Sequence, residues 1–462
     1  MTDHECAPRP KNEIKTLRKI GYTLETSIAD ILDNSITANA KNIKIDIPIS
    51  DKEEPYVSII DDGHGMTKED LIESMRLGCK DPDDEREPGD LGRFGSGMKT
   101  ASFSQAKKLV VISKVKGKAA NAAIWDIDRI VREDKWLLKV ISGKELSEIK
   151  QLKVNKKMKS GTQVLWLNID KYQNLKGSSH GNIEKELAND INSIRRTIRV
   201  YFHRFLKVEQ QDRADISKIN IFLNSDDPLK PIDPFMSSYN GYQDSGKETI
   251  RDKDGVTLIR IHNVPHPELL SREELDDIGG VEFYNAKQGF YIYRDKRLMI
   301  EGDWLNTHAA GILGNRARVQ VDVPSTMDHI WGTDVKKTSF NFPPKVITKL
   351  RTLARNATNT SKKDYKARSK STKKIDDFWE IIEDPRTEKT DYRINSSNSE
   401  LRAIFSHLDD NQTRNKLAQF LSKLSKNLPL KHILFTMGSK PRDVNRTVPS
   451  WKELLNKLTE NQ

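Results

Sequence analysis

A glycine-rich stretch in the first quarter of the chain has the composition of a phosphate-binding loop. Between Asp90 and Thr100 it places Gly92, Gly95 and Gly97 at G-x-x-G-x-G spacing. Glycines at this spacing let backbone N–H groups converge on phosphate oxygens, and a helix that starts just after them adds the positive end of its dipole. Because solvated loops can have the same spacing, this stretch alone leaves both interpretations open.

A carboxylate and an amide further upstream, Asp30 and Asn34, could act on a phosphate chain. Apolar residues recur at helical spacing around them and predict one helix from about residue 15 to residue 38. Side chains four residues apart lie on the same face of a helix. Such a pair could hold a water molecule and a hydrated magnesium ion beside phosphates. A polar, solvated stripe on the helix is the alternative.

Asp61 ends an apolar run at residues 56–60, and a tight turn with Gly63, Gly65 and Met66 follows it. A carboxylate at a strand end can accept a hydrogen bond from an exocyclic amine, while glycines let a flat ring approach the backbone. The alternative is an ordinary connection between a strand and a helix.

Taken in order, these motifs and a later Gly161-Thr162 resemble the GHKL ATPase superfamily. The motif Asp-Leu-Gly-Arg-Phe-Gly-x-Gly-x-Lys-Thr-Ala-Ser, which starts at Asp90, most resembles the corresponding motif of the MORC proteins and their prokaryotic relatives. The resemblance implies an α+β protein with a Bergerat-type (GHKL) ATP-binding α/β sandwich. A transducer-like β/α domain and a small helical C-terminal module are expected to follow it.

The resemblance also implies roles for individual residues, with ATP and Mg²⁺ as cofactors. Asn34 matches the magnesium ligand, and Asp61 matches the carboxylate that reads adenine, helped by Thr162 through water. The phosphate-binding end of the family's lid, the segment that closes over the nucleotide, is matched by Gly92, Gly95, Gly97 and Lys99. The full set expected to bind the cofactor is Asn34, Asp61, Gly63, Gly65, Met66, Gly92, Arg93, Phe94, Gly95, Ser96, Gly97, Met98, Lys99 and Thr162.

Asp30 falls where most of the superfamily has a glutamate that activates the attacking water, so we expect it to be the catalytic base. Aspartate is one methylene shorter, which places its carboxylate about 1.5 Å further from a given water unless the helix moves. General-base geometry tolerates little error. We therefore expect slow hydrolysis, with ATP serving mainly as a conformational latch.

A second catalytic group, a lysine that contacts the γ-phosphate, is implied for the transducer-like domain. Lys337 is the candidate, because Lys337-Thr338-Ser339-Phe340 precedes the last helix of that domain at MORC-like spacing; Lys336 is the near alternative. Such a lysine would sense the third phosphate as a point charge and couple hydrolysis to domain rotation. A loop lysine in water remains the other interpretation.

The length of 462 residues favours two or three domains rather than one. Strands are predicted at residues 43–47, 56–60, 109–113, 122–126, 162–168, 219–223, 256–261, 289–293 and 317–323. We expect a flexible N-terminal arm (1–14), the ATP-binding domain (15–212), the transducer-like domain (213–356), a basic linker (357–374) and the helical module (375–462).

The net charge of +11 permits contact with a polyanion, and nucleotide alone does not explain it. The lysine-rich linker could contact DNA phosphates without sequence preference, or could be a plain solvated tether. No apolar run approaches the roughly 18 residues of a membrane span. Cys6 and Cys79 form no metal-ligand spacing and no disulfide framework, so a cytoplasmic protein without membrane contact is expected.

Two classes of function fit these observations. One is a nucleotide-gated clamp on DNA or nucleoprotein, which forms a homodimer when ATP orders the lid. Bacterial relatives with the same lid motif resemble parts of defence or restriction systems, and this resemblance suggests that such a clamp would act in a prokaryotic defence or restriction-type system. The other class is a chaperone-like or regulatory ATP switch that acts on a protein partner.

Overall fold

The structure is a computed structural model of the chain. It describes residues 4, 8–19, 21–48, 54–78, 97–153, 158–173, 180–207, 218–253, 255–327, 331, 344–371, 378–384 and 389–428. Each strand segment predicted from the sequence overlaps a strand of the structure.

The first unit is built on a seven-stranded sheet with the strand order β5-β4-β3-β6-β2-β1-β7. Neighbouring strands are antiparallel except β1 and β7, which are parallel. The strands are β1 (Asn42–Asp46), β2 (Val57–Asp61), β3 (Ala106–Lys114), β4 (Asn121–Asp126), β5 (Lys139–Ser142), β6 (Gly161–Ile169) and β7 (Asn220–Leu223). The sequence placed residues 219–223 in the second unit; their pairing with β1 corrects this.

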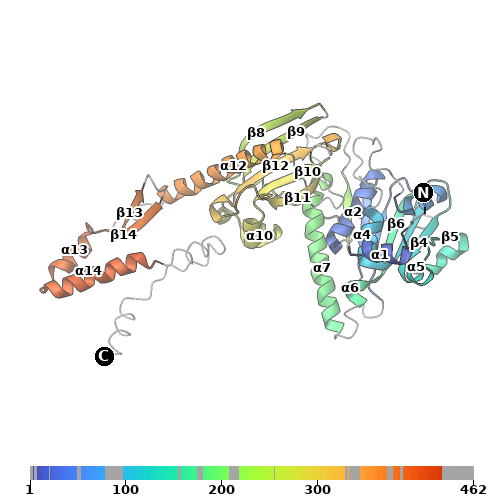
Figure 1. Cartoon of the computed structure of the whole chain (residues 1–462), viewed down its shortest axis with the longest axis horizontal. Helices are drawn as coiled ribbons and strands as arrows, with labels where there is room; N and C mark the ends of the chain where they lie inside the picture. The colour runs from blue at the N-terminus through green and yellow to red at the C-terminus, as the bar shows by residue number, and fades with distance from the viewer. Residues whose placement is uncertain are drawn as a thin grey trace.

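Helices cover one face of this sheet and form the main core with it (Figure 1). A smaller apolar cluster, which includes Leu146 of the short 3₁₀ helix η1 (Gly143–Glu148), lies on the other face. The helices of this unit are α1 (Pro10–Leu17), α2 (Leu24–Thr37), α3 (Lys68–Met75), α4 (Gly97–Gln105), α5 (Ile127–Glu133), α6 (Asp170–Gln173), α7 (His180–Tyr201) and α8 (His203–Leu206).

The N-terminal region differs from the sequence prediction in two ways. The expected flexible arm contains the start of α1 at Pro10, and Ile14 is fully buried. Proline is favoured at the first position of a helix because its missing N–H would have no partner there. The single helix expected from residue 15 to residue 38 is in fact two, separated near Gly21, which has a φ of 79°.

The second unit contains a five-stranded sheet with the order β11-β10-β12-β9-β8. One face packs on the long helix α12 (Pro344–Ser371), and the other packs on a second apolar cluster that includes Val200 of α7. Its remaining elements are β8 (Gln243–Asp252), β9 (Gly255–Asn263), η2 (Pro267–Leu269), α9 (Arg272–Asp277), α10 (Gly280–Ala286), β10 (Gly289–Arg294), β11 (Arg297–Asp303), η3 (Ile312–Gly314), β12 (Ala317–Val323) and η4 (Ser325–Met327).

Helix α12 corrects the prediction of a flexible linker from residue 357. The helix continues to Ser371, and Ala357, Thr358 and Ser361 are buried against the second unit. The sequence pattern missed this because small residues, rather than large apolar ones, make the contact. Figure 1 shows the helix running out from the sheet toward the strands that follow it.

The sequence suggested a helical C-terminal module, but the module is only partly helical. It begins with an antiparallel hairpin of β13 (Trp379–Asp384) and β14 (Lys389–Ile394), followed by α13 (Ser399–Ser406) and α14 (Asn411–Lys426). Its apolar residues near the start are too few to distinguish a short helix from a short strand by period alone. Within the described ranges, no helix is long and apolar enough to cross a membrane.

Candidate functional site

Helix α2 carries the carboxylate and the amide that the sequence singled out. Thr23 and Thr26 form a capping box at its N-terminus and fix where the helix starts. Asp30 is 7% exposed, whereas Asn34, one turn further along, is exposed. A Cβ built on Gly97, the first residue of α4, would lie 3.6 Å from Oδ2 of Asp30. The structure therefore brings the helix after the glycine-rich stretch against the predicted catalytic base.

Asp61 is held at the end of β2 by donors from three separate segments. Its Oδ1 accepts hydrogen bonds from the backbone N–H of Gly63 at 2.9 Å and of Thr162 at 3.2 Å. Its Oδ2 accepts one from Oγ of Ser35 at 3.0 Å. The residue is 6% exposed, and this burial raises the pKa of the carboxyl above its ordinary value despite the three donors. We refer to these four residues as the Asp61 cradle.

Two glycines allow the backbones around the cradle to approach each other closely. A Cβ on Gly65, whose φ is 72°, would lie 2.0 Å from the carbonyl oxygen of Lys114. At Gly161, with a φ of 145°, it would lie 2.1 Å from the carbonyl oxygen of Asp61. Both the backbone conformation and the lack of space therefore require glycine at these positions.

Ser113 belongs to the site but was missed by the sequence analysis. It lies at the end of β3, opposite Thr162 of β6 in the strand register. Its Oγ accepts a hydrogen bond from the backbone N–H of Met66 at 2.8 Å and lies 2.9 Å from Oγ1 of Thr162. Only its position at the end of an apolar run could have pointed to it. Ser113 thus joins the turn after Asp61 to the strand that carries Thr162.

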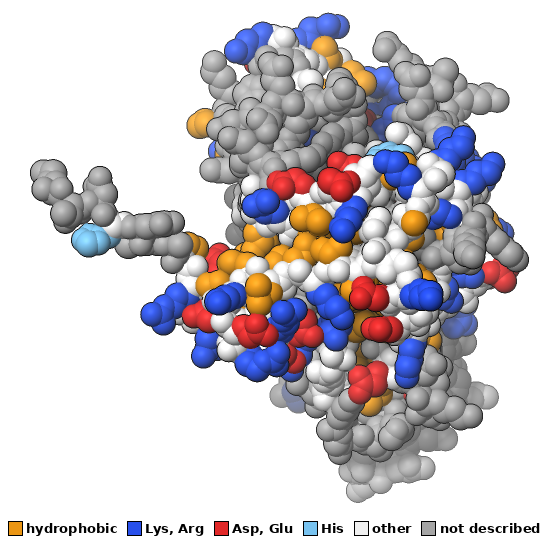
Figure 2. Space-filling model, turned by 90° about the vertical axis from the view of Figure 1, so that its right-hand side faces the viewer, with side chains coloured by type: hydrophobic (Ala, Val, Ile, Leu, Met, Phe, Trp, Pro, Cys, Tyr) orange, Lys and Arg blue, Asp and Glu red, His pale blue; other side chains and the backbone are white. Residues whose placement is uncertain are grey.

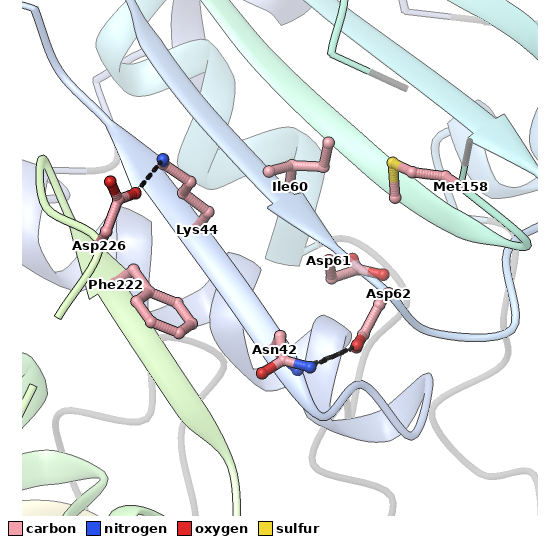
Figure 3. Close-up of a pocket in the computed structure, with 8 residues that line it drawn as sticks. All are labelled: Asn42, Lys44, Ile60, Asp61, Asp62, Met158, Phe222 and Asp226. Carbon is pink, nitrogen blue, oxygen red and sulfur yellow. Dashed lines mark hydrogen bonds and ion pairs between the residues drawn. The ribbon is translucent and has the colours of Figure 1, made fainter. Parts of the chain in front are cut away.

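A shallow pocket of about 310 Å³ lies beside Asp61 and is lined partly by Asp62 (Figure 3). Asp62 accepts hydrogen bonds from the backbone N–H groups of Lys41 and Asn42, and from the Asn42 side chain. Lys44 and Asp226, which also line the pocket, form an ion pair at 3.1 Å. The hydrogen bonds to Asp62 fix the start of β1 against the end of β2, which carries Asp61, and the ion pair joins β1 to the loop after β7.

Lys99 lies in a place that the sequence did not predict. Its side chain is fully buried, and Nζ donates to the carbonyl oxygens of Ser74 at 2.8 Å and Arg76 at 2.7 Å. A cation is favourable there because carbonyl groups at the end of α3 have no partner within the helix. In this structure the ammonium group therefore stabilises α3, and its contact with phosphate remains a prediction.

Several predicted site residues lie outside the described part of the chain. They are Gly92, Arg93, Phe94, Gly95, Ser96, Lys336 and Lys337. Met66 and Met98 are partly buried against the core of the first unit.

Asn34 can serve as a magnesium ligand on chemical grounds. Mg²⁺ in nucleotide sites keeps several waters and takes only one or two protein oxygens in addition to the substrate phosphates. The exposed amide of Asn34 fits this pattern. Among the described residues, no group of three or more His, Cys, Asp or Glu side chains could hold a metal without a nucleotide.

Residues 22–162 match the protein family described as histidine kinase-, DNA gyrase B-, and HSP90-like ATPase. The matched segment contains α2, β2, the whole Asp61 cradle and Ser113. Residues 22–162 form a GHKL-type ATP-binding domain. This confirms the superfamily and the α+β, Bergerat-type fold predicted from the motifs.

Part of the chain is also similar to a MORC protein. Over 92 residues the chain is 27% identical to ATPase morc-1 of Caenorhabditis elegans, which covers 20% of this chain and 10% of the relative. The resemblance of the motifs to MORC proteins is thereby confirmed. The aligned region spans about a tenth of the relative's length.

Proposed function

We propose that this protein is a magnesium-dependent ATPase that acts as a nucleotide-gated, dimeric clamp on DNA or nucleoprotein. The Asp61 cradle is the observation that carries the proposal. A buried carboxylate held in place by three donors is pre-organised to accept a hydrogen bond from the exocyclic amine of adenine. The resemblance to bacterial relatives further suggests a role in a prokaryotic defence or restriction-type system.

The remaining roles follow the arrangement on α2. Asn34 would bind Mg²⁺, and Mg²⁺ would neutralise charge on the phosphates. Asp30 would orient and deprotonate the attacking water, slowly because its side chain is short. Residues 92–99 would close over the phosphates, and Lys337 of the second unit would contact the third phosphate. Closure of the lid would favour pairing of two copies, and hydrolysis would release them.

A basic stripe on α12 supports contact with DNA. Arg351, Arg355 and Lys362 are exposed, and their spacing places them on one face of the helix. The apolar residues of α12 that pack on the second sheet lie on another side of the helix; they are Val346, Leu350, Leu353, Ala354 and Ala357. Arg355 and Lys362 also lower the pKa of nearby His308, although burial of that ring is the larger cause. The stripe spans about 16 Å along the helix, enough for several phosphate contacts.

The surface shown in Figure 2 contrasts with this stripe. It is the side of the molecule on the right of Figure 1, over the β4–β5 end of the first sheet, and positive and negative side chains are interspersed there. At physiological salt the charges of exposed side chains are screened within about 8 Å, so interspersed charges of opposite sign attract a polyanion little. We therefore assign DNA contact to α12 rather than to this end of the ATPase domain.

The test is ATP turnover by the full chain, with and without double-stranded DNA, at low and near-physiological salt. We expect turnover that requires Mg²⁺, is lost in Asn34→Ala, and is stimulated by DNA at both salt concentrations. If Asn34→Ala retains Mg·ATP binding, the metal assignment is wrong. If Asp30→Asn retains the parental rate, Asp30 is not the base.

A second experiment measures DNA binding by two triple variants that lose the same number of positive charges. Replacing Arg351, Arg355 and Lys362 by glutamine should lower DNA affinity and reduce the slope of log K against log salt by about 2 to 3. The control replaces Lys116, Lys118 and Lys135, exposed cations of the first unit, and should change the slope by less than about 1. Equal effects of the two variants would contradict a specific role for α12.

A protein partner is the second candidate function, and the C-terminal module provides its supporting observation. Ile404 of α13 and Phe420 and Leu424 of α14 are about half exposed, at 53%, 61% and 47%. Apolar side chains on one face of an amphipathic helix are typical of contacts with another protein. ATP turnover that DNA does not stimulate, but that changes when residues 399–426 are deleted, would favour a chaperone-like or regulatory switch.

A further inference from the structure

A buried ion pair joins the helix of the ATP site to the second unit. Nε of Arg297 donates to Oδ1 of Asp33 at 2.8 Å, across 264 residues of sequence. The two side chains are only 6% and 1% exposed. Asp33 lies on α2 between Asp30 and Asn34, the predicted base and the predicted magnesium ligand.

The Arg297 side chain is held in place by its surroundings. Its guanidinium group lies over the rings of Phe202 and Tyr201, 4.2 Å and 5.2 Å from their centroids. It also donates to the carbonyl oxygen of Leu298. Arginine stacks on aromatic faces and bonds a carboxylate with a rigid, planar group, which lysine cannot reproduce.

The backbone that carries Arg297 is also constrained. Arg297 is the first residue of β11 and directly follows a two-residue turn that joins it to β10. Both turn residues, Asp295 and Lys296, have positive φ angles of 44° and 72°. Such a turn matches the natural twist of a hairpin and fixes the register of its strands. The second sheet therefore presents Arg297 to α2 at a defined position.

We propose that Arg297 is a positioning residue for ATP hydrolysis, a proposal that rests on the ATPase function proposed above. Through Asp33 it fixes the rotation of α2 about its axis, and therefore the directions of Asp30 and Asn34. The ATPase domain then reaches its active geometry only when the second unit is docked. A buried ion pair adds little net stability compared with apolar packing, so its main effect here is to specify orientation.

Among the described residues, the other ion pairs between the two units do not contact α2 and provide a matched control. Arg199 of α7 binds Asp277 of α9 at 2.6 Å, and these side chains are 20% and 43% exposed. Loss of that pair would weaken the contact between α7 and α9 without affecting Asp33. Arg297→Met and Arg199→Met therefore separate positioning of α2 from general adhesion of the second unit.

The experiment measures kcat, the Kd for ATP with and without Mg²⁺, and thermal unfolding of the full chain. It uses four single variants, Arg297→Met, Arg297→Lys, Asp33→Asn and Arg199→Met, and the double variant Asp33→Asn/Arg297→Met. For Arg297→Met and Asp33→Asn we expect kcat to fall about 10- to 100-fold, since a misplacement of about 1 Å can have such an effect. The Kd for ATP without Mg²⁺ should change less than about threefold, because adenine is bound by Asp61 on another element; the Kd for Mg·ATP should rise, since Asn34 is misdirected as well. Arg297→Lys should recover part of kcat.

Arg199→Met should leave kcat within about twofold of the parental value, since its ion pair lies outside the site. In the double variant Asp33→Asn/Arg297→Met, kcat should fall no further than in either single variant, because both changes break one interaction. Thermal unfolding identifies any variant that fails to fold. If Arg297→Met is such a variant, the kcat of Arg297→Lys, which keeps the charge, tests the positioning role instead.

The possible outcomes separate this inference from the function on which it rests. A parental protein that neither binds nor hydrolyses Mg·ATP would overturn both. Parental turnover combined with a folded Arg297→Met variant that keeps its kcat would overturn only the positioning role. An equal loss of kcat in Arg199→Met would overturn it as well, because the effect would then reflect general loss of contact.

Discussion

Replacing Asp61 by asparagine separates nucleotide recognition from stability at a single site. The carboxylate accepts three hydrogen bonds within the protein, from Ser35, Gly63 and Thr162. An asparagine oxygen can still accept from the two backbone N–H groups, so the turn should keep its shape. Its amide would face Ser35, whose Oγ can turn to donate to the Ile31 carbonyl oxygen 3.3 Å away.

The effect on ATP binding follows from the loss of the charged acceptor. Adenine would meet an amide where it otherwise meets a carboxylate, and a hydrogen bond to a charged group contributes about 1.5–3 kcal/mol. We therefore expect Asp61→Asn to raise the Kd for ATP about 10- to 150-fold. Asp226→Asn, the same chemical change at an exposed residue of the neighbouring pocket, should leave the Kd within about threefold.

The effect on stability has the opposite sign. Burial raises the pKa of Asp61, so ionisation costs more in the folded protein than in the unfolded chain. The stability of the nucleotide-free parent should therefore decrease as pH rises above the ordinary range of an aspartate. Asp61→Asn lacks this decrease and should unfold at a higher temperature at pH 7.

Calorimetry of ATP binding and thermal unfolding between pH 4 and pH 8 would measure both effects. An unchanged Kd in Asp61→Asn would refute adenine recognition by this carboxylate. A variant that binds ATP weakly and is also less stable at pH 7 would show that the cradle, rather than the hydrogen bond to adenine, had been damaged.

Three further predictions concern stability without nucleotide, measured by denaturant unfolding. Gly65→Ala should lower the unfolding free energy by more than about 3 kcal/mol, whereas Gly117→Ala, with a similar φ of 78° but open space around it, should lower it by only about 1–2 kcal/mol. Equal losses would mean that backbone strain alone sets the cost. Lys99→Met should lower it by about 1–3 kcal/mol, because two carbonyl groups at the end of α3 lose their donor; an unchanged value would contradict the structural role of this lysine. Burial lowers the pKa of His262 to about 4, so the stability present above about pH 6.5 should fall toward pH 4, on the order of 3 kcal/mol for this group. His262→Phe should show a smaller fall, and an identical pH profile would exclude His262 as a cause.

The sequence predicted the parts of the site that depend on short-range spacing. Asp30 and Asn34 are one helical turn apart wherever that helix lies, and Asp61 had to end β2 because an apolar run precedes it. The family resemblance associated Thr162 with Asp61, and in the structure the two residues pair across β2 and β6. These features are local in sequence, and only the family resemblance indicated that they form one site.

The sequence could not predict the contacts that bring distant segments together. The Asp33–Arg297 pair spans 264 residues, and no periodicity connects its two partners. The partners of Lys99 are backbone carbonyl groups, which carry no sequence signal. The parallel pairing of β7 with β1 was missed for a related reason: a four-residue apolar strand fits either sheet equally well until its neighbours are known.

The corrected prediction for residues 357–371 changes how an ATP-driven clamp could work. A flexible tether can hold DNA but cannot transmit a rotation, whereas a helix can do both. Helix α12 has 28 residues and is therefore about 42 Å long, so a turn of about 10° at its base would move its far end by about 7 Å. Its base packs on β12, which pairs with β10, and β10 forms the hairpin with β11 that presents Arg297 to the ATP site. On our proposal, a small change in the seating of that hairpin on α2 becomes a large displacement of the basic stripe and of the module beyond it.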